Sequence, residues 1–211
     1  MRKKRTMLKN KRLVIVGAGG HGRVVADIAK KSGAYCDLVF LDDSEEINEK
    51  VHVSGKVSSF AEYIKDSDFI IAIGNNAVRE RLQRMMEGEG ACFATLVHPN
   101  ATVGDGVKLG RGSVVMAGAV LNSCAEVGDG VIINTCSSVD HDCRVGDYTH
   151  ISVGAHVAGT VTIGSKVFVC AGVTVINNVS ICDGCIIGAG ATVIKNIDSS
   201  GTYVGVPANI I

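Results

Sequence analysis

The side chains best suited to chemistry gather in the second half of the sequence, in the run Asp140-His141-Asp142-Cys143. An imidazole beside a carboxylate is the pairing that general base catalysis uses near neutral pH, because the carboxylate orients the ring and raises its basicity. The same dipeptide is also common in solvated polar turns, so the surrounding chain must decide between the two interpretations. His150 and His156 follow closely, and histidine is otherwise rare in this part of the chain.

A metal site is the weaker interpretation of the cysteines. Cys182-Asp183-Gly184-Cys185 has the spacing of half a zinc site, but no second pair accompanies it. His52 and His98 have no carboxylate or cysteine grouping nearby. We therefore predict no metal. The eight cysteines follow no spacing pattern, which favours reduced thiols over a disulfide framework.

A second chemical motif is the glycine run at positions 17–22, Gly-Ala-Gly-Gly-His-Gly. It follows the apolar run Leu13–Val16 and precedes a helical pattern over 23–31. The G-x-G-x-x-G spacing lets backbone amides and a helix N-terminus approach a phosphate. Asp42 and Asp43 end a second predicted strand, Leu38–Leu41, about 20 residues after the glycines, where a carboxylate can accept hydrogen bonds from a ribose.

The rest of this region predicts a small nucleotide-binding fold. A third strand, Phe69–Ile73, ends in Gly74 and leads into a helix over Ala77–Glu87, and a last strand is expected over Cys92–Val97. The glycine spacing is also the dinucleotide fingerprint of nicotinamide-dependent dehydrogenases. Fewer than a hundred residues supply only about one mononucleotide half, which favours a single nucleotide-sugar. A dinucleotide site and a purely structural domain are the alternatives.

The second half of the chain repeats every six residues. Seventeen consecutive positions, each six residues after the last, carry Val, Leu or Ile, from Val97 through Val103 and Leu109 to Val193, and a compact residue stands four places after most of them. No amphipathic helix has this period. So short a repeat cannot bury its apolar face alone, so successive repeats must stack around one core. The pattern resembles the hexapeptide-repeat left-handed parallel β-helix, which implies three repeats per triangular coil of 18 residues.

This coil geometry has consequences for the histidines. His141 is expected to point outwards with Gly159 one coil above it, so a substrate can reach the ring. His150 is expected between Ile132 and Phe168, and it stands nine residues from His141, or one and a half sides of the triangle. The two rings cannot meet within one chain. If both act, the site lies between subunits, which predicts a closed oligomer, most simply a homotrimer.

Composition sets the broad class. Twenty-one basic residues balance twenty-one acidic ones, so no overall charge attracts nucleic acid or an anionic membrane, and we expect a small-molecule ligand. No apolar stretch is long enough for a signal peptide or a membrane span, so a cytoplasmic location is expected. The predicted organisation is a basic solvated tail over 1–11, a Rossmann-like α/β domain over 12–96 and an all-β solenoid over 97–211. The basic cluster comprises Arg2, Lys3, Lys4, Arg5, Lys9, Lys11 and Arg12.

The motifs together resemble one family. They are GAGGHG, LDD after the second strand, IAIGNN after the third, then VDHDC, THISVGAH and a terminal YVGVPA. The set is similar to the sugar acetyltransferases typified by UDP-N-acetylbacillosamine N-acetyltransferase and the sialic acid O-acetyltransferases, from Arg12 onward. The resemblance implies an acetyl-CoA-dependent N-acetyltransferase of a UDP-linked 4-amino-sugar. O-acetylation of a sialic acid or related sugar, and a non-catalytic trimeric module that senses a nucleotide, are the alternatives.

The resemblance also implies roles for individual residues. His141 would be the general base supported by Asp142, and His150 would contact acetyl-CoA from the partner subunit. Two residues one coil apart would line the pantetheine groove, namely Ala171 and Ala189. The nucleotide-sugar would be held by Gly19, Gly20, His21, Asp42, Asp43 and Gly74. The sequence departs from the family pattern at Asp142, where the bacillosamine enzymes carry glutamate, and at Asn209, where relatives often carry a basic residue.

Overall fold

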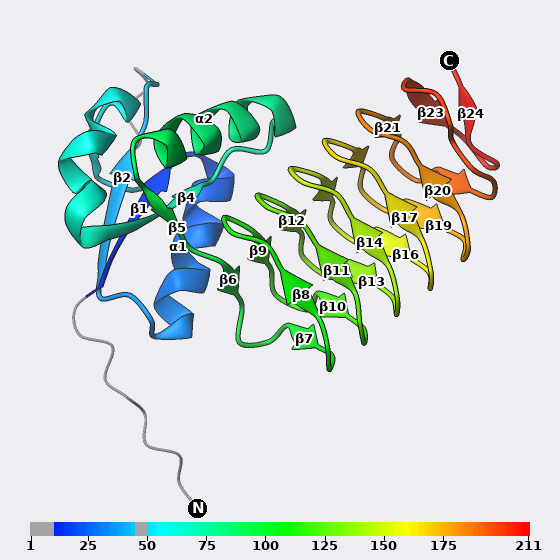
Figure 1. The fold of residues 1–211 in the computed structure, drawn as a ribbon, viewed down its shortest axis with the longest axis horizontal. Helices are drawn as coiled ribbons and strands as arrows, with labels where there is room; N and C mark the ends of the chain where they lie inside the picture. The colour runs from blue at the N-terminus through cyan, green and yellow to red at the C-terminus, as the bar shows by residue number, and fades with distance from the viewer. Residues whose placement is uncertain (1–10, 45–49) are drawn as a thin grey trace, which may run out of the picture.

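The computed structural model describes residues 11–44 and 50–211. A small α/β domain lies at one end of a long three-sided prism of short strands (Figure 1). Most of the predicted basic tail falls outside the described residues. The last two cations of the basic cluster contact the small domain although both stay partly exposed: Lys11 pairs with Asp68 at 2.5 Å and Arg12 pairs with Asp37 at 2.6 Å. Arg12 is the first residue of a strand.

The small domain is built on a five-stranded parallel sheet in the order β3-β2-β1-β4-β5. Its strands are β1 (Arg12–Val16), β2 (Asp37–Leu41), β3 (Val53–Gly55), β4 (Ser67–Ile71) and β5 (Cys92–Phe93). Both faces of β1 are buried, which explains its continuous apolar run. Leu13 and Ile15 pack on the side of helix α1 (Gly20–Ser32), whereas the alternate residues face α2 (Asn76–Gly88) and the 3₁₀ helix η1 (Val57–Asp66).

Several predicted boundaries were wrong. The first helix begins at Gly20 rather than at residue 23, because Gly22 has no side chain and can approach the carbonyl of Gly17. The third strand ends at Ile71, two residues early. The segment predicted as one strand over Cys92–Val97 is two strands, β5 and then β6 (Leu96–Val97), which belong to different sheets. β3 and η1 were not predicted, since their few apolar residues are interrupted by polar ones.

The solenoid has three parallel sheets, called faces I, II and III in chain order, and every strand is two residues long except for one strand of three at the end of face I. Face I contains β6, β9 (Val114–Val115), β12 (Ile132–Ile133), β15 (His150–Ile151), β18 (Phe168–Val169), β21 (Ile186–Ile187), β23 (Thr202–Val204) and the antiparallel β24 (Asn209–Ile210). Face II contains β7 (Thr102–Val103), β10 (Val120–Leu121), β13 (Ser138–Val139), β16 (His156–Val157), β19 (Thr174–Val175) and β22 (Thr192–Val193). Face III contains β8 (Lys108–Leu109), β11 (Glu126–Val127), β14 (Arg144–Val145), β17 (Thr162–Ile163) and β20 (Ser180–Ile181).

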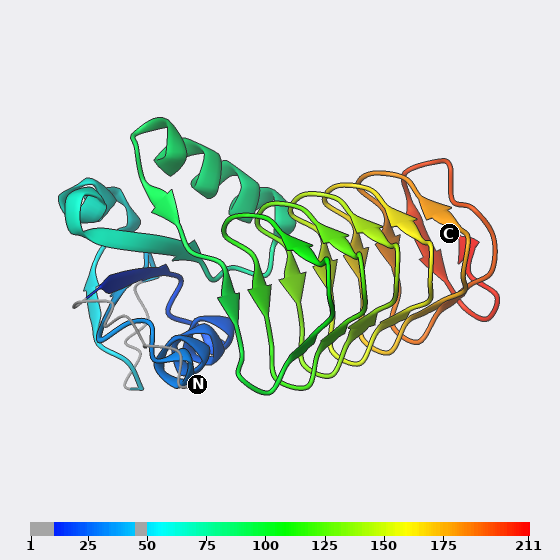
Figure 2. The same cartoon turned by 60° about the horizontal axis from the view of Figure 1, so that its bottom comes forward.

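The register confirms the coil of 18 residues. Ile132 pairs with Val114 on one side and with His150 on the other. The chain therefore turns three corners in each coil, and the three-sided section is visible when the prism is turned (Figure 2). We call these corners I–II, II–III and III–I after the faces that they join.

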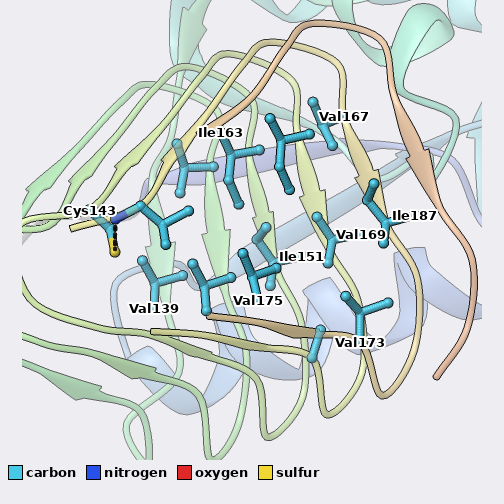
Figure 3. Close-up of a cluster of buried hydrophobic side chains, with 14 of the residues drawn as sticks. Val139, Cys143, Ile151, Ile163, Val167, Val169, Val173, Val175 and Ile187 are labelled. Atoms are coloured by element: carbon cyan, nitrogen blue, oxygen red, sulfur yellow. Dashed lines mark hydrogen bonds between the residues drawn. The ribbon is translucent and has the colours of Figure 1, made fainter. Parts of the chain in front are cut away.

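The aliphatic residue of each repeat fills the interior, as predicted. From Val115 to Val193 every sixth residue is at most 5% exposed, and these side chains point toward one another across the prism (Figure 3). The first coil is the exception, because no coil lies beneath it. Val103 is 41% exposed there, and Val97 and Leu109 are only partly buried.

The compact residues turn inward at the corners, and the polar ones among them keep their hydrogen bonds. The hydroxyl of Ser113 donates to the carbonyl of Gly128 at 2.8 Å and accepts from the Val131 amide at 2.9 Å. Thr149 repeats this arrangement with Gly164 and Val167. These buried hydroxyls are therefore satisfied, and they tie adjacent coils together.

The small domain rests on the first coils of the solenoid. Val25 and Ile28 of α1 share one apolar cluster with Leu96, Val114 and Ile132 on the outside of face I. α2 extends from the small domain to the coils (Figure 2) and contacts the III–I corner. Neither helix, nor any other helix within 11–44 and 50–211, has the length and apolar character needed to cross a lipid bilayer.

Candidate active site

His141 lies on the II–III corner, after β13, with its side chain 56% exposed. Its Nδ1 atom is 2.8 Å from Oδ2 of Asp142, so the short aspartate side chain does reach the ring. Asp142 has a φ of 58°, a left-handed conformation that aspartate tolerates better than most residues. The predicted histidine–carboxylate pair is therefore formed within one turn.

Asp140 holds the same turn from its other side. Its Oδ1 atom accepts hydrogen bonds from the Asn122 side chain at 2.6 Å and from the backbone amide of His141 at 2.7 Å. These hydrogen bonds lower the pKa of Asp140, which keeps it ionised. Two carboxylates thus flank the imidazole. The hydrogen bond with Asp142 is the main cause that raises the pKa of His141, so the ring is a stronger base than a free imidazole.

Gly159 stands one coil above His141, as the repeat predicted. A Cβ atom at this position would come within 2.5 Å of Nε2 of the His141 ring. The imidazole therefore occupies the space of the absent side chain, and Nε2 carries the lone pair that can accept a substrate proton when Nδ1 donates to Asp142.

Ala171 and Ala189 lie on the I–II corner in adjacent coils, linked by the hydrogen bond from Gly190 to the carbonyl of Ala171 at 2.9 Å. Both residues are exposed, and their own amide groups donate to no acceptor in the described part of the chain. A column of open N–H donors is the kind of surface that can bind an amide carbonyl of a pantetheine arm.

His141 and the two alanines are not brought together in one chain. The II–III corner and the I–II corner lie at opposite ends of the face II strands. A site that uses both must be completed by another copy of the chain.

The six residues predicted to hold the nucleotide-sugar do converge. Gly19, Gly20, His21, Asp42, Asp43 and Gly74 line one cavity of about 410 Å³ beside the carboxyl ends of β1, β2 and β4. The two carboxylates also hold the cavity's loops, since Asp42 accepts from the Ala18 amide at 2.6 Å and Asp43 from the Val57 amide at 2.8 Å. Among residues 11–44 and 50–211, no side chain caps the N-terminus of α1 and its first amides have no acceptor, so they are available to a ligand in this cavity.

A second cavity of about 400 Å³ adjoins the first, and Gly74 lines both. One wall is Gly74 and Asn75 with the first turn of α2, and the other is the outside of face I at His150, Phe168 and Ile186. The rings of His150 and Phe168 stack with their centroids 5.0 Å apart. His150 therefore lies between the small domain and the solenoid of its own chain, on the face that leads to Ala171.

His21 and His150 are both neutral at physiological pH. Burial is the main cause that lowers the pKa of His21 to about 4 and that of His150 to about 3, and the nearby Arg79 charge lowers both further. Within the described part of the chain, Nε2 of His21 is buried without a hydrogen-bond partner, and Nδ1 of His150 has only a contact with the Gly74 backbone that is too weak to count as one. Such unpaired polar atoms beside two cavities are typical of a ligand site.

Two residues of this region were missed by the sequence analysis. Arg79 is 1% exposed and binds both domains, and Asn134 contacts Nε2 of His150 at 3.0 Å. The signal for Arg79 was its spacing, because Arg79, Leu82, Gln83 and Met86 follow the i, i+3, i+4, i+7 pattern of a buried helix face. Asn134 had no such signal.

The remaining candidates have local roles. Cys185 is buried in the core with its sulfur 3.4 Å from that of Cys182. Nδ1 of His156 lies 2.9 Å from the hydroxyl of Ser138, and His98 accepts from the Asn100 amide at 3.0 Å. Among residues 11–44 and 50–211, no three His, Cys, Asp or Glu side chains are close enough to hold a metal ion.

Both the small domain and the solenoid match known protein families. Residues 12–86 match the family described as the PglD N-terminal domain, and residues 160–195 match the bacterial transferase hexapeptide family. The chain is similar to UDP-N-acetylbacillosamine N-acetyltransferase of Bacillus subtilis, with 36% identity over 112 residues, which are 51% of this chain and 52% of that protein. The chain thus spans about half the length of this curated relative.

Two solved structures are similar over nearly the whole chain. The acetyltransferase domain of PglB from Neisseria gonorrhoeae in complex with acetyl coenzyme A has a TM-score of 0.91 and 36% identity, covering 96% of this chain and 100% of that one. PerB from Caulobacter crescentus in complex with CoA and GDP-perosamine has a TM-score of 0.89 and 35% identity, covering 94% and 96%.

Proposed function

The chain belongs to the hexapeptide-repeat sugar acetyltransferases that carry a PglD-type N-terminal domain, and from this we propose that it transfers the acetyl group of acetyl-CoA to the amine of a nucleotide-linked amino-sugar. The single observation that carries the proposal is the pair of cavities that meet at Gly74. Together they lead from a nucleotide-sized site past Gly74 to the outside of face I, whose strands end at the I–II corner with its open backbone amides. A nucleotide-sugar laid along this path has its sugar over His150 and Phe168.

His141 is the general base in this proposal. Its neutral Nε2 takes the proton from the sugar amine as the nitrogen attacks the thioester carbon, so that a C–N bond forms and the C–S bond breaks. The departing CoA thiolate then recovers a proton, and no covalent enzyme intermediate is required. Asp142 holds the proton on Nδ1 and stabilises the imidazolium that forms at Nε2.

Acetyl-CoA lies along the I–II corner. The amides of Ala171 and Ala189 bind the pantetheine arm, and the stacked ring of His150 contacts the acetyl end beside them. Open amides there also stabilise the charge that develops on the thioester oxygen. All these groups come from one chain, whereas the base comes from the next.

The working unit is therefore a homotrimer. Only the II–III corner of a neighbouring copy can bring His141 to face I, and a three-sided prism closes most simply with three copies. Each of the three sites then combines the cavities of one chain with the base of its neighbour.

We take a UDP-linked 4-amino-sugar as the acceptor, in line with the similarity to the Bacillus subtilis protein. The test is to incubate the protein with acetyl-CoA and a panel of UDP- and GDP-linked amino-sugars together with hydroxyl acceptors such as sialic acid. Thiol release and the mass gain of one acetyl group are expected with the UDP-linked amine. Reaction with the GDP-linked amine alone would correct the nucleotide, and reaction with hydroxyl acceptors alone would overturn the proposal.

A second experiment distinguishes an enzyme from a protein that only assembles and binds nucleotide. His141→Ala is expected to lose at least about a hundredfold in turnover, the usual contribution of a general base, while the oligomer persists. Full turnover in this variant would rule out His141 as the base. A chain that assembles and binds nucleotide but releases no thiol with any acceptor would instead be a non-catalytic module.

A further inference from the structure

Arg79 is a buried cation without a buried anion. It is 1% exposed, and it forms no ion pair with any carboxylate among the described residues. Burial lowers its pKa to about 10, which still leaves it charged at neutral pH. A guanidinium in this setting is costly unless its donors are satisfied and its charge has a use.

All of its donors are satisfied by neutral oxygen atoms from both domains. Nε donates to the carbonyl of Gly130 at 2.6 Å, and Nη2 donates to the carbonyl of Tyr148 at 2.7 Å. These two acceptors belong to the III–I corner. On the other side, Nη1 donates to the carbonyls of Ile73 and Gly74 at 2.9 and 3.2 Å, and Nη2 to the side-chain oxygen of Asn76 at 2.8 Å.

The direction of the two loop carbonyls decides where the loop amides point. Every peptide bond in this loop is trans, and in a trans peptide the N–H group points opposite to the C=O group. Since the carbonyls of Ile73 and Gly74 face Arg79, the N–H groups of Gly74 and Asn75 face away from it. These amides have no acceptor within the described chain, nor do those of Asn76 and Ala77 in the first turn of α2.

His150 places a second polar group at the same wall, beside the Gly74 backbone. The Thr135 amide donates to Oδ1 of Asn134 at 2.8 Å, so Nδ2 of Asn134 must be the atom that donates to Nε2 of His150. The neutral ring therefore carries its hydrogen on Nδ1, which lies against the backbone of Gly74 but makes no full hydrogen bond among the described residues, in a side chain only 8% exposed. It lines the second cavity together with Gly74.

We propose that Arg79 is a positioning residue for the diphosphate of the nucleotide-sugar, which binds at Gly74 where the two cavities meet. Arg79 turns the loop amides toward the diphosphate and leaves an unpaired positive charge behind them. Its bonds to Gly130 and Tyr148 fix the same loop to the solenoid, so the diphosphate is held at a set position relative to the reaction site. The inference rests on the proposed function, because it takes the ligand to be a nucleotide-sugar.

The test compares diphosphate and nucleoside binding in Arg79→Met, Arg79→Lys and the control Arg84→Met. Arg84 is on the same helix but is 63% exposed and lines neither cavity. For each protein, calorimetry measures the affinity for UDP or GDP, whichever binds the unmodified protein. The affinity for the matching nucleoside is measured in the same way and compared with it. Arg79→Met is expected to weaken diphosphate binding by roughly 10- to 100-fold, the range for loss of a charge several ångströms away in a partly buried site.

Nucleoside binding should change by less than about threefold, because the base and ribose do not contact the charge. Arg79→Lys keeps the positive charge but not the planar set of five N–H donors. It should therefore weaken diphosphate binding less than Arg79→Met does. Equal weakening of diphosphate and nucleoside would mean a purely structural role and would overturn the proposal, as would unchanged diphosphate binding.

If Arg79→Met fails to fold, the same comparison in Arg79→Lys decides. Diphosphate binding equal to that of the unmodified protein would then overturn the proposal. Failure of the unmodified protein to bind UDP, GDP or dTDP would refute the nucleotide site itself, and Arg79's role with it. If the unmodified protein and the Arg79 variants bind the nucleoside diphosphate equally well, the role of Arg79 is refuted and the nucleotide site stands.

Discussion

The imidazole of His141 fills the space beside Gly159 in which a Cβ atom would lie 2.5 Å from Nε2. The atoms nearest to that Cβ all belong to the His141 ring, and none belongs to the backbone. Gly159→Ala should therefore displace the ring and leave the coil intact. A misplaced base loses about 10- to 100-fold in kcat, which a thiol-release assay measures.

The matched control for this substitution is Gly88→Ala. Gly88 is at the end of α2, and a Cβ there meets no atom within 4 Å. Gly88→Ala should keep normal turnover. Equal rates in the two variants would show that the position of the ring does not matter for the reaction.

Asp142→Asn tests the carboxylate through the pH profile. The hydrogen bond with Asp142 raises the pKa of His141, and the base must be neutral to accept a proton. The rate of the native protein should therefore fall as pH drops through a value above 6.5. In Asp142→Asn the pKa falls, so this limb of the kcat/KM profile moves to lower pH, while the maximal rate drops about tenfold because the base is weaker and less well oriented. If the acidic limb of the kcat/KM profile stays at the same pH in Asp142→Asn, the group that titrates is not His141.

Stability should depend on pH through the two buried histidines. His21 and His150 have pKa values of about 4 and 3 when folded, against about 6.5 when unfolded. Below pH 6.5 the unfolded chain takes up protons that the folded chain does not, so the free energy of unfolding falls as pH falls toward 4. Each histidine contributes up to about 1.4 kcal/mol per pH unit.

Denaturation at several pH values measures this slope. His150→Gln removes one titrating group, so its slope between pH 6 and 4.5 should be shallower than that of the native protein by up to about 1.4 kcal/mol per pH unit. His156→Gln changes an exposed histidine on face II and serves as the control. Equal slopes in His150→Gln and the native protein would mean that His150 is already protonated in the fold.

Subunit mixing tests whether two chains build each site. His141→Ala removes the base, and Ala171→Arg blocks the I–II corner, so each variant alone should be inactive. In a 1:1 mixture of a closed trimer, about a quarter of the sites combine an intact base with an intact corner, and activity should return to that level. Mixing His141→Ala with a chain that carries both changes is the control and should recover nothing. Mixed trimers without activity would place the whole site in one chain.

The solenoid could be predicted because its periodicity is itself the physical cause of the fold. A two-residue strand between corners cannot be buried unless the next coil covers it, so Val, Leu or Ile at every sixth position determines both the core and the 18-residue register. The neighbours of His141 and His150 then followed by counting, as Gly159 and Phe168 show. The glycine run likewise located one wall of the nucleotide cavity, because its backbone conformation is a local property.

Only the tertiary structure shows how the small domain packs on face I, and the contacts of the site depend on this packing. That docking brings His150 beside Gly74 and buries Arg79 between Ile73 and Tyr148, although His150 and Tyr148 are far from the other three residues in the chain. No local pattern encodes such contacts, because they arise from the shapes of two surfaces that form only after each domain has folded. The sequence by itself therefore determined the coil and the chemical groups that it presents, and the packing of the two domains decided which of those groups share a site.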